Sequence, residues 1–287
     1  MPQPSGTAQG GSNTPYALGY TSNENDRLIR QAARIAPITE RLFRDAGIGE
    51  GKRVLDLGSG MGDVAMLVAR LVGPSGQVLG VERDSSSVAR ARARVEAAGL
   101  RNVTFTHGDV SELASDMPFD AAVGRFILMF LPDPRTVLES VVRLVRPGGA
   151  VAFQEPTWIP FLAFSKRLPL WSRMLQTIHE TFLRAGVNPE MGPELYRLFP
   201  EVGLPAPNMH VEMALGSDAE FSGLICDLLS SVRALAEHHQ VSLKDLGDLE
   251  TLSQRVQAEI AQANTMVSFV PMVGVWAKKP AAHENRD

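Results

Sequence analysis

The chain has 287 residues, of which 44% are hydrophobic and 21% charged, and its formal net charge is −4. These values are ordinary for a globular protein with a sizeable core, either one α/β domain with additions or one and a half domains. The acidic balance leaves no basic footprint for nucleic acid or an anionic membrane, so we expect neither as a partner. The single cysteine, Cys226, excludes an intramolecular disulfide, and no Cys/His cluster has metal-ligand spacing, so no metal is expected.

Both ends of the chain are predicted to be short tails outside the folded core. Residues 1–15 are rich in Gly, Ser, Pro, Thr and Asn, which predicts disorder, and 281–287 form a second short tail. The opening residues lack the basic and apolar regions of a signal peptide, and the longest apolar run, 121–131, is short and interrupted by Arg125. With the lone cysteine, this predicts a cytoplasmic protein.

Residues 16–48 are predicted to form cap helices ahead of the sheet. Apolar residues recur at helical spacing between 28 and 46, with a break or kink expected at Pro37. Tyr16 and Tyr20 precede this helix. They would either close over a ligand as substrate contacts or pack the helix onto the core.

The stretch 53–63 predicts a strand, a glycine-rich loop and the start of a helix. A β-branched and leucine run ends in Asp56, and Gly58, Gly60 and Gly62 follow at alternate positions. Glycines let such a loop turn sharply, accept positive φ, and allow a ligand to approach the backbone N–H groups. A carboxylate two residues before the first glycine disfavours an anionic dinucleotide and favours a cationic ligand.

The pattern Asp56-x-Gly58-x-Gly60-x-Gly62 resembles motif I of the class I S-adenosylmethionine-dependent methyltransferases, whose ligand carries a sulfonium and an α-amino group. The resemblance implies S-adenosylmethionine as cofactor and S-adenosylhomocysteine as product. It also implies a doubly wound α/β fold with a mostly parallel seven-stranded sheet whose last strand is antiparallel. The resemblance is good over 50–155 and extends only to the outline beyond that.

Further elements follow at intervals that suit this fold. Strands are predicted at 77–82, 102–107, 119–125, 150–155, 209–215 and 266–276, and helices at 85–98, 135–145 and 194–203. Ligands of open parallel sheets bind at the carboxyl ends of the strands. We therefore expect the functional side chains at those ends.

Cofactor contacts are expected at the ends of the second and third strands. Glu82 lies about 20 residues past the loop, where doubly wound folds place a carboxylate for ribose hydroxyls. The alternative gives that role to Asp84, which otherwise caps the next helix. By position, Asp109 and Val110 match the family's contacts to the adenine amine and a ring nitrogen. The predicted cofactor-binding residues are Asp56, Gly58, Ser59, Gly60, Gly62, Glu82, Arg83, Asp109, Val110 and Arg125.

The end of the fourth strand bears on the acceptor. An Asn/Asp-Pro-Pro-aromatic run there would indicate transfer to a planar amino nitrogen, and the chain has 123–126, Val-Gly-Arg-Phe, instead. Arg125 would anchor an anionic acceptor or the cofactor carboxylate. In-line methyl transfer depends on alignment, and a base is optional. The candidate catalytic bases are Glu155 and His179, whose plain alternatives are a strand-end cap and a helix-surface residue.

Two helical segments, 157–190 and 217–263, are predicted as inserts that form a lid over the carboxyl edge of the sheet. The first is rich in aromatic residues, and Trp158 and Phe182 suit a small, largely apolar acceptor. They would equally suit the lid's own core or a homodimer interface. The cofactor-binding core then comprises 49–156, 191–216 and 264–280.

We therefore expect an S-adenosylmethionine-dependent methyltransferase that acts on a small molecule at oxygen, nitrogen or carbon. A protein or RNA methyltransferase is disfavoured by the acidity and the enclosing lid. A nicotinamide-dependent oxidoreductase should show Gly-x-Gly-x-x-Gly in its loop. A non-catalytic S-adenosylmethionine-binding module would bind the cofactor without turnover.

Overall fold

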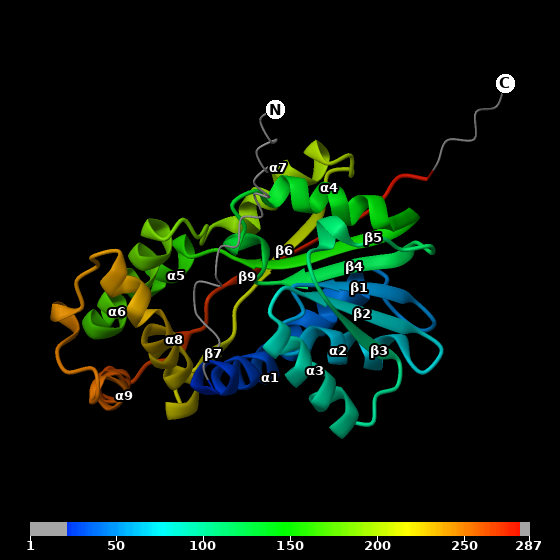
Figure 1. The fold of residues 1–287 in the computed structure, drawn as a ribbon. Helices are drawn as coiled ribbons and strands as arrows, with labels where there is room; N and C mark the ends of the chain where they lie inside the picture. The colour runs from blue at the N-terminus through cyan, green and yellow to red at the C-terminus, as the bar shows by residue number, and fades with distance from the viewer. Residues whose placement is uncertain (1–21, 282–287) are drawn as a thin grey trace, which may run out of the picture.

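The structure, a computed structural model, describes residues 22–281 and is built on one central sheet (Figure 1). Its seven strands have the order β3-β2-β1-β4-β5-β9-β6. The strands of the sheet are β1 (Arg53–Leu57), β2 (Gln77–Glu82), β3 (Val103–His107), β4 (Phe119–Arg125), β5 (Val145–Pro156), β6 (Asn208–Glu212) and β9 (Met272–Lys278). The predictions for the tails, Tyr16 and Tyr20 lie wholly or mainly outside the described residues.

The sheet is parallel from β3 to β5, and β9 runs antiparallel to both of its neighbours, β5 and β6. The predicted fold class is therefore confirmed: a doubly wound α/β sheet of seven strands whose last strand is antiparallel. Its central strands are near-continuous apolar runs because helices cover both faces. Val54 and Leu55 show the alternation, since one packs into the core on each face.

Helices lie on both faces of the sheet, with α4 and α7 on one side and α1, α2 and α3 on the other (Figure 1). These helices are α1 (Ser22–Asp45), α2 (Asp63–Val72), α3 (Ser85–Ala97), α4 (Pro134–Leu144) and α7 (Met191–Glu201), with the 3₁₀ turns η1 (Val110–Glu112) and η2 (Leu128–Phe130) between them. Helix α3 begins where Asp84 accepts the Ser87 N–H at 2.6 Å, and α4 begins at Asp133 with Pro134 in its first turn.

The remaining helices, which we call the insert helices, lie together at one side of the sheet (Figure 1). They are α5 (Ile159–Phe164), α6 (Pro169–Arg184), α8 (Ala219–His238) and α9 (Leu252–Gln262), with the turns η3 (Ser165–Arg167) and η4 (Lys244–Leu246). They fall within the two predicted inserts, and α6, α8 and α9 pack against one another. The strands predicted at 209–215 and 266–276 are each divided: β6 and β9 belong to the central sheet, while β7 (Leu215–Gly216) and β8 (Val267–Ser268) pair with each other in a separate two-stranded sheet.

Helix α1 connects the insert helices to the sheet. It continues through Pro37 instead of ending there. Two exposed ion pairs connect it to α8 and the residue that caps α8: Arg30 to Asp227 at 2.6 Å and Arg34 to Asp218 at 3.1 Å. Its second half packs on α2, β5 and β9. One helix therefore spans both parts of the molecule.

Candidate functional site

A cleft of about 1460 Å³ lies at the carboxyl ends of β1 to β5, the edge at which open parallel sheets bind ligands. Its wall also includes side chains of α1, α6 and α8. The predicted site residues that line this cleft are Gly58, Ser59, Gly60, Glu82, Arg83, Asp109, Val110, Arg125, Trp158 and Phe182. Those that do not line it are Asp56, Gly62, Glu155 and His179.

The glycine loop between β1 and α2 needs its glycines for different reasons. Gly58, Gly60 and Gly62 have φ of 61°, 49° and 82°, a region that side chains disfavour. A Cβ on Gly58 would meet Ile127 at 2.5 Å, and one on Gly62 would meet Phe105 at 2.9 Å. Gly60 has nothing within 4 Å and faces open space. The loop is thus packed on its protein side and open on its cleft side.

Two buried polar atoms at this loop have no partner within residues 22–281: Oδ2 of Asp56 and Oγ of Ser59. Asp56 is 1% exposed, and burial raises its pKa to about 8 although the guanidinium of Arg125 opposes the shift. An unpartnered buried carboxylate oxygen is costly, and a nearby cationic group would reduce that cost. The orphaned atoms and the open glycine cradle fit the amino-acid end of S-adenosylmethionine.

Glu82 stands on the cleft wall at the end of β2. Its carboxylate accepts the N–H of Gly60 and the N–H of Asp84, both at 2.9 Å. A carboxylate offers about four acceptor positions, so Glu82 retains capacity for two ribose hydroxyls. The carboxylate of Asp84 is engaged with Ser86 and Ser87 as the cap of α3. This geometry corresponds to the first of the two predicted assignments.

Asp109 and Val110 follow β3 and both line the cleft. The Asp109 carboxylate accepts the N–H and O–H of Ser111 at 2.8 and 2.7 Å and pairs with Arg83. Burial alone would raise the pKa of Asp109, but these bonds outweigh it and hold the pKa below its usual value. Asp109 therefore begins η1 as an ionised cap, and its contact with adenine stays a prediction.

Arg125 reaches the cleft from the end of β4. Its Nη1 donates to Thr39 Oγ1 at 3.0 Å, and Thr39 Oγ1 donates to Gln154 Oε1 at 2.7 Å. Burial lowers the pKa of Arg125, and the carboxylates of Asp63 and Asp56 act in the opposite direction. Thr39 and Gln154 were not predicted as part of the site. They lie 115 residues apart in the chain, and no local pattern indicates that they meet.

Glu155, a candidate base with a strand-end cap as its alternative, is not among the residues that line the cleft. It is 0% exposed, and its carboxylate accepts the N–H of Ile127 and Leu128 at 2.9 Å each and of Met129 at 3.3 Å. Burial raises the pKa of Glu155 to about 7, against these three bonds. The geometry is that of a strand-end cap. It fixes the loop in which Phe126, at φ 52°, lines the cleft.

His179 is also off the cleft wall, on α6. Its half-buried ring lies 5.9 Å from the ring of Trp158, and burial lowers its pKa while Glu190 opposes the shift. Trp158 and Phe182 do line the cleft, and their rings meet edge to face at 5.7 Å. These two aromatics thus belong both to the cleft wall and to the packing of the insert helices. His179 lies against the side of Trp158, so its catalytic assignment lacks geometric support.

The part of the chain that the structure describes shows neither a metal site nor a membrane-spanning helix. Within residues 22–281, no group of three or more His, Cys, Asp or Glu side chains could hold a metal ion. Nor does any helix in that range have the length and apolar character needed to cross a membrane.

The fold is Rossmann-like, with a seven-stranded, mostly parallel sheet and a glycine loop after its first strand at the edge of the cleft. A family model described as a methyltransferase domain matches residues 48–200, more than half of the chain. The chain belongs to the class I S-adenosylmethionine-dependent methyltransferase family, and the family implies S-adenosylmethionine as the cofactor.

Two curated relatives and one solved structure illustrate the likeness. An arsenite methyltransferase from Aquipseudomonas alcaligenes is 40% identical over 114 residues, which are 37% of this chain and 33% of that protein. A demethylmenaquinone methyltransferase from Bacillus cytotoxicus is 33% identical over 175 residues, 56% of this chain and 73% of that protein. The structure of a putative methyltransferase from Bacillus halodurans has a TM-score of 0.56 at 16% identity, over 84% of this chain and 98% of that one.

Proposed function

We propose that this protein transfers the methyl group of S-adenosylmethionine to a small, largely apolar acceptor held under a lid formed by segments 157–190 and 217–263. The observation that carries the proposal is the continuity of one cleft. It joins the glycine loop and the strand ends to an apolar wall supplied by α1, η2 and the insert helices. We call these two parts the cofactor half and the acceptor half.

The cofactor half supplies polar partners along an extended ligand. Glu82 would accept the ribose hydroxyls, and Asp109 with the Val110 N–H would contact the adenine. Asp56 and Arg125 would balance the charges of the amino-acid end. When bound, S-adenosylmethionine supplies an electrophilic methyl group, and the open side of Gly60 gives it room beside the loop.

The acceptor half is apolar and aromatic. The described residues that define it are Leu28, Phe130, Trp158, Phe182, Leu228 and Phe269. Such a wall buries a flat apolar molecule and excludes water from the reacting atoms. Neither Glu155 nor His179 lines the cleft, so we propose that alignment and water exclusion, rather than either of these groups as a base, supply the catalysis.

The two relatives suggest different acceptors. Trivalent arsenic, as a soft centre, prefers thiolate ligands. Here the one cysteine, Cys226, is buried, burial raises its pKa to about 11, and its Sγ lies 3.8 Å from Met174 Sδ. This chain therefore offers no exposed thiolate set, and a quinone-like or other ring compound suits the aromatic acceptor half better.

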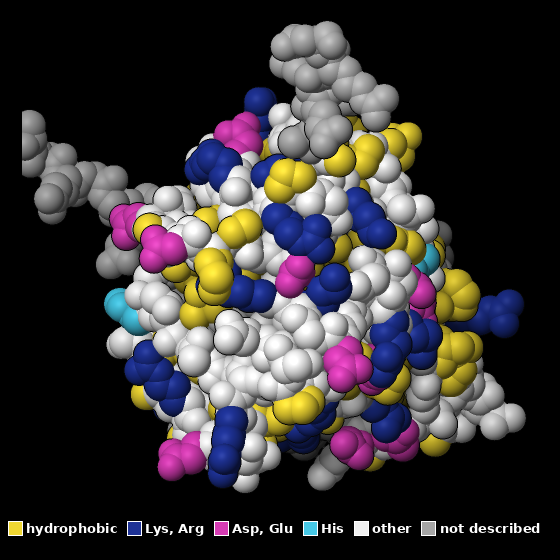
Figure 2. Space-filling view, turned by 90° about the vertical axis from the view of Figure 1, so that its right-hand side faces the viewer, with side chains coloured by type: hydrophobic (Ala, Val, Ile, Leu, Met, Phe, Trp, Pro, Cys, Tyr) yellow, Lys and Arg dark blue, Asp and Glu magenta, His cyan; other side chains and the backbone are white. Residues whose placement is uncertain are grey.

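The surface charge supports a small acceptor over a nucleic acid. Figure 2 shows one face of the molecule, on which the Lys and Arg side chains are interspersed with acidic and apolar ones. A protein that follows a phosphate backbone instead gathers its basic residues into a patch or stripe.

The test is calorimetric titration with S-adenosylmethionine, S-adenosylhomocysteine and NADH, followed by transfer of a labelled methyl group to a panel of two-ring phenols and quinols. We expect micromolar binding of the two sulfur ligands, no binding of NADH, and label in at least one ring compound. Binding of NADH alone would overturn the cofactor. Cofactor binding with transfer only to RNA or protein would overturn the acceptor class.

A further inference from the structure

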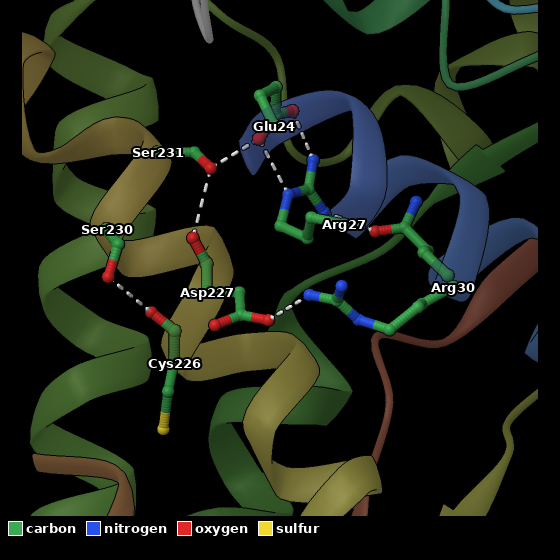
Figure 3. Close-up of polar contacts among 8 residues, drawn as sticks. Glu24, Arg27, Arg30, Cys226, Asp227, Ser230 and Ser231 are labelled. Carbon is green, nitrogen blue, oxygen red and sulfur yellow. Dashed lines mark hydrogen bonds and ion pairs between the residues drawn. The ribbon is translucent and has the colours of Figure 1, made fainter. Parts of the chain in front are cut away.

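A buried arginine lies on the cleft wall where α1 meets α8 (Figure 3). Arg27 is 2% exposed, although arginine is almost never fully buried unless it is paired. The motif-based assignment of the site does not include this residue. Leu28 of the same helix and Leu228 of α8 line the same cleft and belong to the acceptor half, and we assign Arg27 to that half with them.

Arg27 is held in place by a bidentate ion pair. Its Nε and Nη2 donate to the two carboxylate oxygens of Glu24 at 2.8 and 2.5 Å, and its Nη1 donates to Gln31 Oε1 at 2.6 Å. The Ser231 hydroxyl of α8 also donates to Glu24 (Figure 3). A guanidinium fixed in this way is preorganised, and little side-chain entropy is lost when it binds a ligand.

The guanidinium keeps donors to spare. It carries five N–H groups, and the contacts to Glu24 and Gln31 engage three of them. One N–H on each terminal nitrogen therefore has no partner among the side chains and backbone groups that the structure describes, which leave out the side chains of 22, 23, 25 and 166. Gln31, whose amide oxygen accepts from Arg27, also lines the cleft, and its amide carries N–H donors of its own.

The charge at this point is already balanced. Glu24 and Arg27 are both 2% exposed and neutralise each other, so the pair offers hydrogen-bond donors without net charge. An anionic group would add an uncompensated charge to an apolar wall, whereas a neutral carbonyl oxygen would accept hydrogen bonds from the spare N–H donors without adding charge.

We propose that Arg27 and Gln31 form an oxygen-binding subsite for the methyl acceptor, and that the acceptor is a neutral ring compound with a carbonyl-type oxygen. The inference rests on the proposed function and deepens it. Arg27 is a specificity-determining residue that contacts the acceptor away from the transferred methyl group.

The test compares two probes with one carbon skeleton: 1-tetralone, which has a ring carbonyl, and tetralin, which lacks it. Calorimetry with protein saturated with S-adenosylhomocysteine gives the affinity ratio of the two. We expect the wild-type protein to favour 1-tetralone and Arg27→Met to lower the ratio about 10- to 100-fold, since hydrogen bonds to a charged group are lost. A purely structural role for Arg27 would weaken both probes equally and leave the ratio unchanged.

Two further variants keep the result interpretable. Arg27→Met leaves Glu24 as an unpaired buried charge, so the double variant E24Q/R27M removes both charges and should show the same fall in ratio. Arg30→Met, one turn further along α1, removes an exposed arginine paired with Asp227 and should leave the ratio at the wild-type value.

The outcomes separate the two proposals. Loss of S-adenosylhomocysteine binding in the wild-type protein contradicts the proposed function. Normal cofactor binding with an unchanged probe ratio in E24Q/R27M overturns the subsite alone. Failure of cofactor-loaded wild-type protein to bind either probe overturns the apolar acceptor and the subsite together.

Discussion

The two halves of the cleft are lined by different kinds of groups. The cofactor half uses carboxylates and backbone groups at the ends of sheet strands, among them Glu82 and Asp109. The acceptor half uses apolar side chains from helices and a single neutral ion pair, Glu24 with Arg27. The end of β2 is fixed by ladders to β1 and β3, and that of β3 by its ladder to β2, whereas the helices hold their positions by packing. Cofactor affinity and acceptor specificity should therefore respond to different substitutions.

The largest effect is expected at Gly58. Gly58→Val places a β-branched side chain at φ 61° and against Ile127 at 2.5 Å, so the loop must rearrange. We expect S-adenosylhomocysteine affinity to fall by more than about 100-fold by calorimetry. Gly99→Ala is the matched control, because φ is 66° there and nothing lies within 4 Å of the added Cβ. Equal binding losses in both variants would show general unfolding instead of a cofactor effect.

Asp56 gives a pH-dependent prediction. Its folded pKa of about 8 exceeds the unfolded value near 4, so the folded protein binds an extra proton between these pH values. Stability without ligand should therefore fall as pH rises through that window, as urea unfolding would show. Cofactor affinity should rise with pH up to about 8, because ionised Asp56, behind the cleft wall, would attract a cationic amino group through its charge.

The Asp56→Asn variant isolates this group. We expect it to weaken S-adenosylhomocysteine binding about 10-fold or more at pH 8, since the attraction between a buried carboxylate and the cationic amino group is lost. Its affinity should vary little between pH 6 and pH 8. A pH profile identical to that of the wild-type protein would assign the titration to another group.

A smaller effect is expected at Glu155, which connects the two halves. In Glu155→Gln an amide N–H₂ replaces an oxygen that accepts backbone N–H groups, which should cost about 1–3 kcal/mol of unfolding free energy in urea. Glu139→Gln removes an exposed pair with Arg135 and should stay within about 0.5 kcal/mol of wild type. A loss of methyl transfer without a loss of stability would restore Glu155 as a base.

The smallest effect is expected at Phe182. Phe182→Leu removes the edge-to-face contact with Trp158 and part of the apolar wall, and should weaken binding of a ring compound about three- to tenfold. Cofactor affinity should not change, which fluorescence or calorimetry can show. Leu183→Ala, at an exposed neighbouring position, provides the control. A parallel loss of cofactor affinity would mean that the two halves are not independent.

Sequence patterns predicted the sheet well because its signals are local, and most of the loop and strand-end residues that they singled out line the cleft. The strands at 77–82 and 119–125 have the predicted bounds, and the loop residues follow β1 directly. The acceptor half depends on contacts between distant segments, such as Glu24 with Ser231, which lie 207 residues apart. Short strands like β7 and β8 are too brief to show any periodicity. The spacing of residues along the predicted helix also does not show that His179 lies against Trp158 and away from the cleft wall.

Cys226 makes the molecule convenient for spectroscopy. A buried thiol whose pKa is raised to about 11 stays protonated at neutral pH and reacts slowly with maleimides. A cysteine introduced on the exposed surface of α5, at Phe164, would therefore be the dominant labelling site without removal of the native one. A second label at Arg90 of α3 would complete a pair for distance measurements, with and without cofactor, between the insert helices and the sheet.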